Sequence, residues 1–437
     1  MCGVAGLIGP GAVSRQEAVR RMNAIQRSRG PDDEGLFVEP QVVLGHVRLA
    51  ILDLTSAGHQ PMTTPDGRFT LVYNGEIYNY LELQDELGGR ETFQSRTDSE
   101  VLLRAYARWG AGCLDRLRGM FAFAIWDRQE QAVFLARDRF GIKPLYYARH
   151  GDRWLFASEI KALLAGGVEP HPDSAVIAEY LCTSLYDHQE ETFFSGIRRL
   201  LPGHCLTIRA DGRLDGPHRY YDLPSRVRPL HVPFEEAKER LLVLLREAIR
   251  LHLRADVPVG INLSGGIDSS VLLALAAEDP GRVRQLRAFT IDYSGTAYAE
   301  RPWVEQLLER FPVPCTFTAM TDEACAAAIP AMVWSQDEPF GGVPTVSWSS
   351  LYQEARSQRV PVLLDGSGVD DCFAGYRANV LRALARRMQG SPRADGSGEL
   401  AAFCRVWGTD EPGLRRELEA VSDRERRPVA MDGTRPV

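Results

Sequence analysis

Hydrophobic and polar positions alternate differently in the two halves of the chain. Over residues 2–210, short apolar runs are separated by Gly, Pro, Asp and Asn, which is typical of strands in an antiparallel sheet system. Two helical stretches interrupt them, and each follows a pair with capping-box spacing, Ser14 with Glu17 and Thr97 with Glu100. The pattern predicts an α+β domain in this part of the chain.

The pattern changes after a stretch rich in proline. We interpret residues 211–233 as a linker and residues 234–437 as a second domain. A long amphipathic helix opens that domain, and continuous apolar runs then alternate with helical segments, at 257–263, 286–292 and 360–366. This alternation favours an α/β fold with a doubly wound parallel sheet. The tail after about residue 415 is polar and rich in arginine, and we expect it to be poorly ordered.

Composition narrows the class of protein. The 437 residues suffice for two or three domains of roughly 150 residues. The net charge of −7, from 51 basic and 58 acidic residues, argues against a nucleic-acid partner. No apolar run approaches the roughly 18–20 residues that cross a bilayer, so we expect no membrane partner. The N-terminus lacks the basic region of a secretory signal. Eight cysteines without a CxxC pair predict neither a disulfide framework nor a zinc site, so we expect a reduced, cytoplasmic protein.

The first candidate for chemistry is Cys2. A small residue after the initiator Met1 favours removal of that methionine, which would place a thiol and a free α-amino group on one residue. This pairs a nucleophile with a proton acceptor. Taken alone, a second-position cysteine is more often incidental and packs as a small hydrophobic residue.

The segments around and after Cys2 strengthen the catalytic interpretation. In order they are MCGVAGLIG, RGPDDEG, HVRLAILD, GHQPM, YNGEIYNY, RTDSE, GMFAFAIWD, RDRFGIKPLYY and ASEIKALL. Together they resemble the class II glutamine amidotransferase domain, an N-terminal-nucleophile hydrolase, over residues 2–210. The resemblance implies an αββα sandwich with glutaminase activity.

The resemblance also implies roles for single residues. Cys2 would attack the side-chain amide of glutamine, and Asn74 with the N–H of Gly75 would form the oxyanion hole. Arg48 would bind the substrate α-carboxylate. Glutamine's α-ammonium group would be held by two acids, Glu76 and Asp98.

Each of these binding residues also has a structural interpretation. The segment 73–76 has the look of a hairpin turn. Asp98 stands in the first turn of a helix, where an acid is favourable in any case. The alternative interpretation of Arg48 is an ordinary surface residue.

A glycine loop in the second half carries the other candidate chemistry. Residues 263–270, LSGGIDSS, follow a predicted strand and open a helix, where glycines and free N–H groups suit a phosphate. The alternative interpretation is that this loop is only a turn between a strand and a helix and binds no phosphate. The loop lacks the GK[ST] of a Walker A motif and resembles the pyrophosphate loop of ATP pyrophosphatases.

Two further segments complete the resemblance of this half to asparagine synthetases, DEPFGGVPT at 337–345 and LLDGSGVDDCFAGY at 363–376. The resemblance implies ATP and Mg²⁺ as cofactors and no prosthetic group. Asp268 and Asp370 would hold Mg²⁺. The structural alternative for Asp370–Asp371 is a solvated turn, and Ile291, an implied ligand of ATP, is expected to be a core residue in either case. The other implied ATP and pyrophosphate ligands are Leu263, Ser264, Gly265, Gly266, Ser269, Ser270, Ile291, Asp365 and Gly366.

The implied reaction joins the two halves. A carboxylate acceptor, aspartate or a specialised acid, is adenylated by ATP with release of pyrophosphate, and ammonia from glutamine, carried through an internal tunnel, displaces AMP. The partners are thus small molecules, with a homodimer as a further expectation.

Three features depart from the family pattern. Ser367 stands at the adenylation-loop position where asparagine synthetases usually have an acid or an amide, and a serine cannot act as a carboxylate base. The family's Asp-Glu pair is Asp370–Asp371 here. No lysine follows Lys238, and the chain is short at its C-terminal end. The alternative function is therefore a glutaminase or ammonia-donor subunit with a ligation-defective, nucleotide-binding half. A third is a non-catalytic scaffold.

Overall fold

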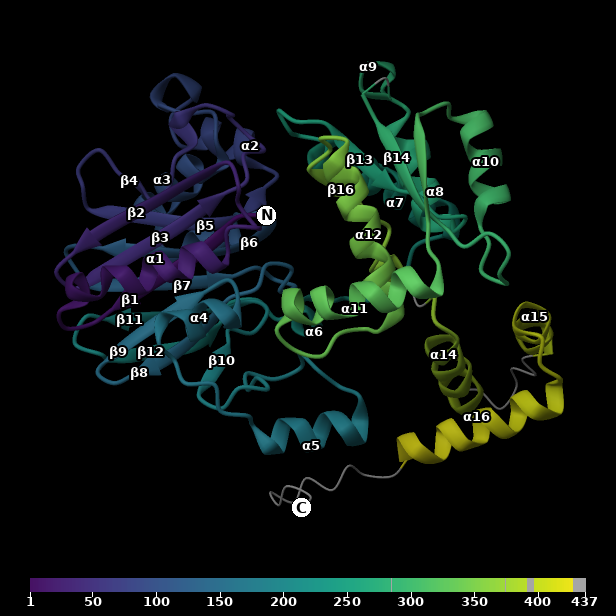
Figure 1. Ribbon diagram of the computed structural model, residues 1–437. Helices are drawn as coiled ribbons and strands as arrows, with labels where there is room; N and C mark the ends of the chain where they lie inside the picture. The colour runs from purple at the N-terminus through teal and green to yellow at the C-terminus, as the bar shows by residue number, and fades with distance from the viewer. Residues whose placement is uncertain (284, 374, 391–396, 427–437) are drawn as a thin grey trace. The chain divides into compact units, whose positions relative to one another are not determined.

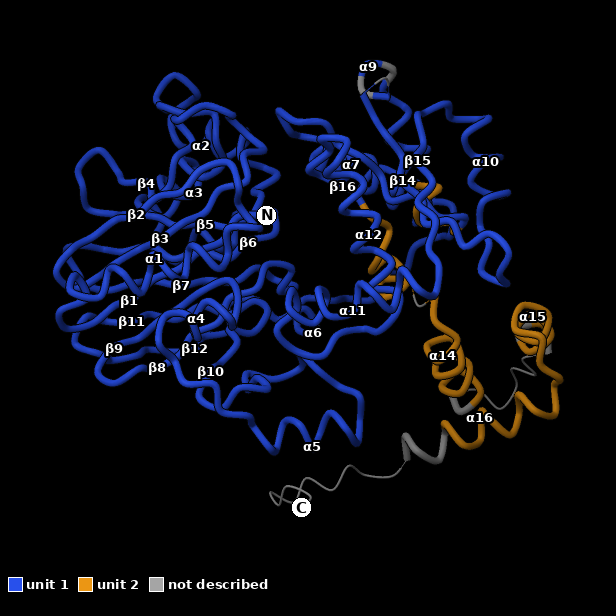
Figure 2. The backbone as a smooth tube through the Cα atoms, viewed as in Figure 1, with its two compact units in different colours: residues 1–265, 273–364 blue, residues 266–272, 365–437 orange. Residues whose placement is uncertain are grey.

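The computed structural model describes residues 1–437 apart from 284, 374, 391–396 and 427–437 (Figure 1). The described residues form two compact units (Figure 2). Unit 1 comprises residues 1–265 and 273–364, and unit 2 comprises residues 266–272 and 365–437.

The first sheet of unit 1 has β1 (Gly3–Ile8) near its centre. β1 pairs antiparallel with β3 (Val42–Arg48) and β9 (Arg153–Ala157). The remaining strands are β2 (Asp33–Glu39), β8 (Tyr146–His150) and β10 (Ile197–Arg199), in the order β10-β8-β9-β1-β3-β2. Two helices pack their apolar residues against one face, α1 (Gln16–Ile25) and α4 (Ile160–Gly166).

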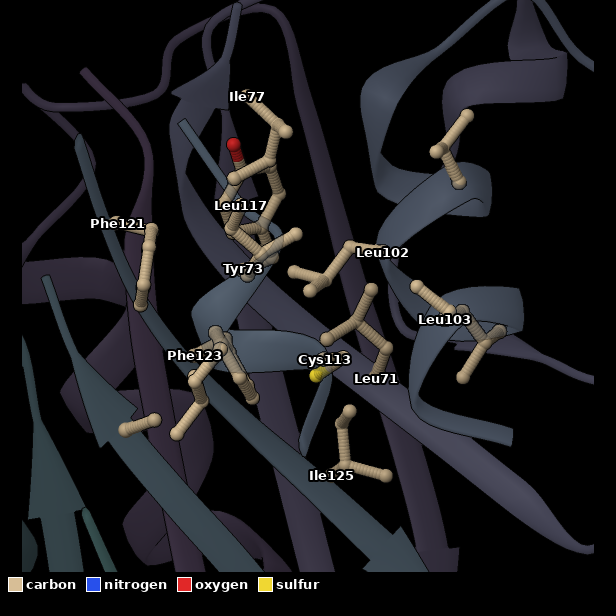
Figure 3. Close-up of a cluster of buried hydrophobic side chains, with 14 of the residues drawn as sticks. Leu71, Tyr73, Ile77, Leu102, Leu103, Cys113, Leu117, Phe121, Phe123 and Ile125 are labelled. Carbon is tan, nitrogen blue, oxygen red and sulfur yellow. The ribbon is translucent and has the colours of Figure 1, made fainter. Parts of the chain in front are cut away.

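The second sheet is also antiparallel, and β5 (Phe69–Ile77) and β6 (Gly119–Asp127) lie side by side within it. Its other strands are β4 (Met62–Thr63), β7 (Ala132–Arg137), β11 (His204–Arg209) and β12 (Leu214–Arg219), in the order β12-β11-β7-β6-β5-β4. Helix α3 (Asp98–Trp109) covers one face, and Leu102 and Leu103 pack with Leu71 of β5 (Figure 3). Helix α2 (Tyr80–Glu86) adds Leu83 to this cluster.

The opposite faces of the two sheets share one core. Val4 and Leu44 from the first sheet pack with Val72, Ala124 and Leu135 from the second, all without exposed surface. Burying both inner faces explains the continuous apolar runs of these strands. The predicted αββα sandwich is confirmed.

Short elements connect the sandwich. They are four 3₁₀ turns, Ala12–Arg15, Ser56–Gly58, Arg90–Thr92 and Gly110–Asp115, and the helices α5 (Ser174–Thr183) and α6 (Leu223–Arg226). β12 pairs with β11, so the second sheet continues past residue 210 into the stretch interpreted as a linker.

The α/β part of unit 1 begins with helix α7 (Phe234–His252). Four parallel strands follow, β13 (Val259–Asn262), β14 (Arg287–Asp292), β15 (Cys315–Ala319) and β16 (Val362–Leu364), in the order β15-β14-β13-β16. The helices between them are α8 (Ile267–Ala276), α9 (Pro280–Val283), α10 (Arg301–Arg310), α11 (Asp322–Gln336) and α12 (Val343–Ser357). Helix α12 packs Leu351 and Ala355 on Phe289 of β14. The predicted doubly wound parallel sheet is confirmed, because the strand order reverses between β13 and β16.

Helices make up most of unit 2. They are α13 (Val369–Phe373), α14 (Arg377–Gly390), α15 (Ser397–Trp407) and α16 (Glu411–Arg426). Leu414 and Leu418 of α16 pack against Leu381 and Phe403. Helix α16 thus extends to Arg426, into the part of the tail after about residue 415 that was expected to be poorly ordered. The rest of that tail, 427–437, lies outside the described residues.

Two smaller expectations have clear outcomes. The eight cysteines all lie within the described residues, and each of them is free. None of the described helices combines the length and the apolar character that a membrane span requires.

Candidate active site

Strand β1 holds Cys2 against the end of β3. The ladder between β1 and β3 ends at the pair of Gly3 with Val47, which brings Cys2 beside the backbone of Leu49. The Leu49 N–H donates to Sγ at 3.4 Å, and Sγ lies 3.7 Å from the Leu49 carbonyl oxygen. Arg29 Nε donates to the Cys2 carbonyl at 2.9 Å. Cys2 is half-buried, and contacts to both its backbone and its sulfur hold it in place.

Burial shifts the protonation of both groups at this terminus. It raises the pKa of the Cys2 thiol, which therefore stays protonated at neutral pH. It lowers the pKa of the α-amino group of Met1 to about 5, so that this amine is neutral under the same conditions. Removal of Met1 would turn the backbone nitrogen of Cys2 into a free α-amino group, and such an amine, when neutral, suits the role of proton acceptor for a neutral thiol.

Strand β5 carries the predicted oxyanion donors. Asn74 is 1% exposed, and among the described residues neither its Oδ1 nor its Nδ2 has a hydrogen-bond partner. A buried amide without partners is costly unless a ligand satisfies it. A Cβ on Gly75 would lie 2.3 Å from the Met120 carbonyl oxygen, so only glycine fits there. Because 73–76 lie inside β5 and pair with β6, the hairpin-turn interpretation was wrong.

Arg48 ends β3, and its guanidinium is enclosed by backbone. It donates to the carbonyl oxygens of Leu52 at 3.1 Å, Asp53 at 2.6 Å and Thr55 at 2.9 Å. A Cβ on Gly58 would lie 1.9 Å from the guanidinium, so a larger residue here would displace the Arg48 side chain. Arg48 is 6% exposed, and the interpretation as a surface residue was wrong. These three bonds leave two of the five donors of an arginine for a carboxylate.

Two acids lie close together, Glu76 on β5 and Asp98 at the start of α3. Asp98 opens helix α3 and accepts from Tyr73 Oη at 2.7 Å and Ile77 N–H at 2.8 Å. Burial raises the pKa of Asp98 to about 6 despite these bonds. Burial, and then repulsion from Asp98, raises the pKa of Glu76 well above its usual range. A cation placed between such acids is strongly favoured, which suits the ammonium group of an amino acid.

The raised pKa of Asp98 predicts a pH dependence. As the pH falls through about 6, Asp98 takes up a proton and its attraction for an ammonium group is lost, so the KM for glutamine should rise below that value. We expect glutaramate, which lacks the α-amino group, to show a KM that does not follow this titration. Steady-state assays from pH 5 to roughly pH 8 with both substrates provide the check. A glutamine KM that stays constant across this range would contradict the assignment.

Two further residues of this site were not singled out from the sequence. Lys143 is 5% exposed, and burial lowers the pKa of its ammonium group to about 8, with Glu76 and Cys2 as attracting neighbours. Arg29 joins Cys2 to Glu159, whose Oε1 lies 2.9 Å from the guanidinium. Arg29 lies in the segment RGPDDEG and Lys143 in RDRFGIKPLYY, two of the segments on which the resemblance rests. The sequence therefore pointed to these segments but not to the roles of the two residues.

In unit 1, the phosphate-loop residues follow β13 at the reversal of strand order. Leu263 is buried, its N–H donates to Phe289 O at 2.8 Å, and its carbonyl oxygen accepts from Thr290 Oγ1 at 2.9 Å. Gly265 N–H donates to Glu300 Oε2 at 3.2 Å. Ile291 is half-buried on β14. Ligands of open α/β sheets bind at such a reversal, beyond the carboxyl ends of the strands.

In unit 2, the two acids predicted to bind metal, Asp268 and Asp370, interact electrostatically. The pKa of Asp268 is raised by burial and then by Asp370. Gly366 lies against the same loop, since a Cβ there would be 3.0 Å from Asp268 Cβ. The described residues include no group of three or more His, Cys, Asp or Glu side chains placed to bind a metal. Two carboxylates still fit Mg²⁺, which usually completes its shell with water and substrate phosphates.

The remaining predicted loop residues of unit 2 make local hydrogen bonds, and Ser269 and Ser270 stand near the start of α8. Ser270 Oγ donates to the Gly266 carbonyl at 2.6 Å, and Ser269 Oγ does so at 3.3 Å. Ser367 N–H donates to Asp365 Oδ1 at 2.7 Å. Asp370 stands in the first turn of α13 rather than in an isolated solvated turn.

Comparisons with known proteins decide the family. Residues 1–221 match the model of the glutamine amidotransferase domain, and residues 240–435 match that of asparagine synthase. A putative asparagine synthetase [glutamine-hydrolyzing] 2 from Methanocaldococcus jannaschii is 32% identical over 97% of this chain and 83% of its own. The chain belongs to the glutamine-hydrolysing asparagine synthetase family. It is an asparagine synthetase-like amidotransferase in which a glutamine amidotransferase domain precedes an asparagine synthase domain.

Other members of the asparagine synthetase family are longer than this chain. Asparagine synthetase [glutamine-hydrolyzing] 1 of Bacillus subtilis is 31% identical over 86% of this chain, and Amidase chyE of Penicillium rubens is 32% identical over the same share. This chain spans 59% of the length of each of these two relatives.

Proposed function

We propose that the chain is an ATP-dependent, glutamine-hydrolysing amide ligase. The observation that carries the proposal is the buried amide of Asn74, which has no hydrogen-bond partner among the described residues. Its site also holds the Cys2 thiol and two acids with raised pKa values. A buried donor without a partner is what a developing oxyanion requires, and the acids supply the complementary place for an ammonium group.

At the glutaminase site, Cys2 acts as the nucleophile. Its thiol proton passes to the α-amino group, and the sulfur attacks the side-chain carbonyl carbon of glutamine. The negative charge on the carbonyl oxygen is stabilised by Asn74 Nδ2 and Gly75 N–H. The amine returns the proton to the leaving nitrogen, ammonia departs, and water hydrolyses the glutamyl thioester. Arg48 holds the α-carboxylate throughout.

At the synthetase site, the loop after β13 binds the pyrophosphate part of ATP. An acceptor carboxylate attacks the α-phosphorus, so that pyrophosphate leaves and an acyl-adenylate forms. Ammonia then attacks the acyl carbon and AMP leaves. Mg²⁺, when bound by Asp268 and Asp370, would neutralise phosphate charge. The nucleotide pocket is proposed to include Leu263, Ser264, Gly265, Gly266, Ser269, Ser270, Ile291, Asp365 and Gly366.

The acceptor is proposed as a class rather than as one compound. Aspartate is the first candidate from the family, and a relative named as an amidase supports testing other carboxylic acids. Action in the cytoplasm, assembly as a homodimer and the absence of a prosthetic group belong to the same proposal.

The experiment supplies glutamine, Mg²⁺–ATP and a panel of acids, and it measures pyrophosphate and AMP. Pyrophosphate should form only with an acceptor. Asp370→Asn should lower this rate about tenfold or more, because one charge of the cation site is lost, while glutamine hydrolysis continues. The matched control is Asp371→Asn. Equal loss in both variants would contradict the metal assignment, and no pyrophosphate with any acid would contradict ligation.

One observation favours a second candidate function. Ser367 replaces the acid expected in the adenylation loop, and its N–H is used in a local turn with Asp365. A glutaminase whose nucleotide-binding half does not ligate would fit this loop. Glutamine hydrolysis that responds to ATP without AMP production would identify it.

A further inference from the structure

Arg48 is held by one short loop, residues 51–55, which we call the clamp loop. Three carbonyl oxygens of the clamp loop accept from the guanidinium, those of Leu52, Asp53 and Thr55. Asp53 makes the shortest of these bonds, at 2.6 Å. The direction of the two remaining guanidinium donors therefore depends on the backbone conformation of the clamp loop.

Asp53 has an unusual conformation that its contacts enforce. Its φ is +50°, in the left-handed region that is unfavourable for most residues other than glycine. Its Oδ1 accepts from Thr55 Oγ1 at 2.6 Å and Thr55 N–H at 3.2 Å, and Oδ2 accepts from Arg96 N–H at 2.9 Å. Burial alone would raise the pKa of Asp53, but these hydrogen bonds outweigh it and lower the pKa. The carboxylate thus stays ionised and keeps the loop folded.

The remaining polar group of Asp53, its N–H, is bound by a residue far along the chain. Asp256 Oδ2 accepts from this N–H at 2.8 Å, and the Asp256 N–H donates to Ile51 O at 2.9 Å. Asp256 lies between α7 and β13, outside the amidotransferase sequence, yet within unit 1. These two hydrogen bonds attach Asp256 to the first and third residues of the clamp loop, Ile51 and Asp53.

We propose that Asp256 is a positioning residue for glutamine, acting through Asp53 and the clamp loop on Arg48. By fixing the Asp53 N–H, it sets the left-handed turn whose carbonyl aims the guanidinium at the substrate α-carboxylate. The inference rests on the proposed function, because it requires Arg48 to bind that carboxylate. It adds a residue of the synthetase half to the determinants of glutamine affinity.

The test compares three variants in a glutaminase assay without ATP. Asp256→Ala removes the acceptor and should raise the KM for glutamine roughly five- to tenfold, with kcat changed by less than about twofold. Asp256→Asn keeps an acceptor oxygen and should restore most of the affinity. Glu82→Gln is the matched control, since Glu82 binds Arg254 at 2.7 Å, two residues from Asp256, without touching the clamp loop. Asp256 is exposed, so its truncation leaves no buried cavity.

A second substrate separates positioning from general damage. The compound 4-aminobutanamide is glutamine without its α-carboxylate, so its KM should be equal in wild type and Asp256→Ala. An unchanged glutamine KM in Asp256→Ala, or an equal rise for both substrates or in Glu82→Gln, would overturn the inference. Failure of the proposed function looks different, because the wild-type protein itself would then release no ammonia from glutamine.

Discussion

Replacing Cys2 with alanine is expected to abolish glutamine hydrolysis, with kcat lowered by about 10⁴- to 10⁶-fold. The variant loses the sulfur that forms the thioester, and Cys2, which directly precedes β1, is the residue whose sulfur contacts Leu49. Glutamine should still bind, since Arg48 and the two acids are intact. Ammonia release measures the effect, and amidation supplied with free ammonia should continue.

Two matched cysteine variants control for chemical side effects. Cys182→Ala changes an exposed thiol, and Cys205→Ala changes a buried one in the second sheet. Both should hydrolyse glutamine at close to the wild-type rate. Substantial hydrolysis by Cys2→Ala would refute the assignment of the nucleophile.

The second large effect is expected at Asn74. Asn74→Ala should lower the kcat for glutamine hydrolysis by about 10²- to 10³-fold with little change in KM, because the amide donor acts on charge that develops only in the transition state. In the free protein this side chain makes no hydrogen bond to any described residue, so its removal breaks no such bond. The thermal unfolding midpoint should therefore stay near that of wild type.

Asn79 provides the comparison. Its Nδ2 donates to Arg116 O at 3.0 Å and its Oδ1 accepts from Arg118 N–H at 2.8 Å, so this amide is structurally occupied. Asn79→Ala should reduce stability more than activity. If Asn74→Ala hydrolysed glutamine at the wild-type rate, the oxyanion assignment would fail.

Local sequence patterns predicted the elements better than their ends. Thr97 caps α3 as expected, accepting from Glu100 N–H at 3.3 Å. The same spacing at Ser14 misled, because a 3₁₀ turn precedes α1 and the Ser14 hydroxyl donates back to Gly11 O at 2.8 Å. Both sequences have capping residues at the right distance, and only the backbone before each helix distinguishes them.

The candidate site was predictable where a motif carries the chemistry. Cys2, Asn74 and Arg48 stand in such motifs, and the structure adds their burial and contacts. Asp256 carries no motif, because its contact with Asp53 spans 203 residues and depends on how separate elements pack. Periodicity reports which face of an element is buried, and it does not report which distant residue will meet it.

The central claim is that Cys2, as the first residue of the mature chain, forms a covalent glutamyl thioester. Peptide mass spectrometry of protein quenched in acid during turnover with glutamine tests this most directly. We predict an N-terminal peptide that begins at Cys2 and carries one glutamyl group on sulfur, absent from Cys2→Ala. An active protein that retains Met1, or a glutamyl group attached to another residue, would contradict the account.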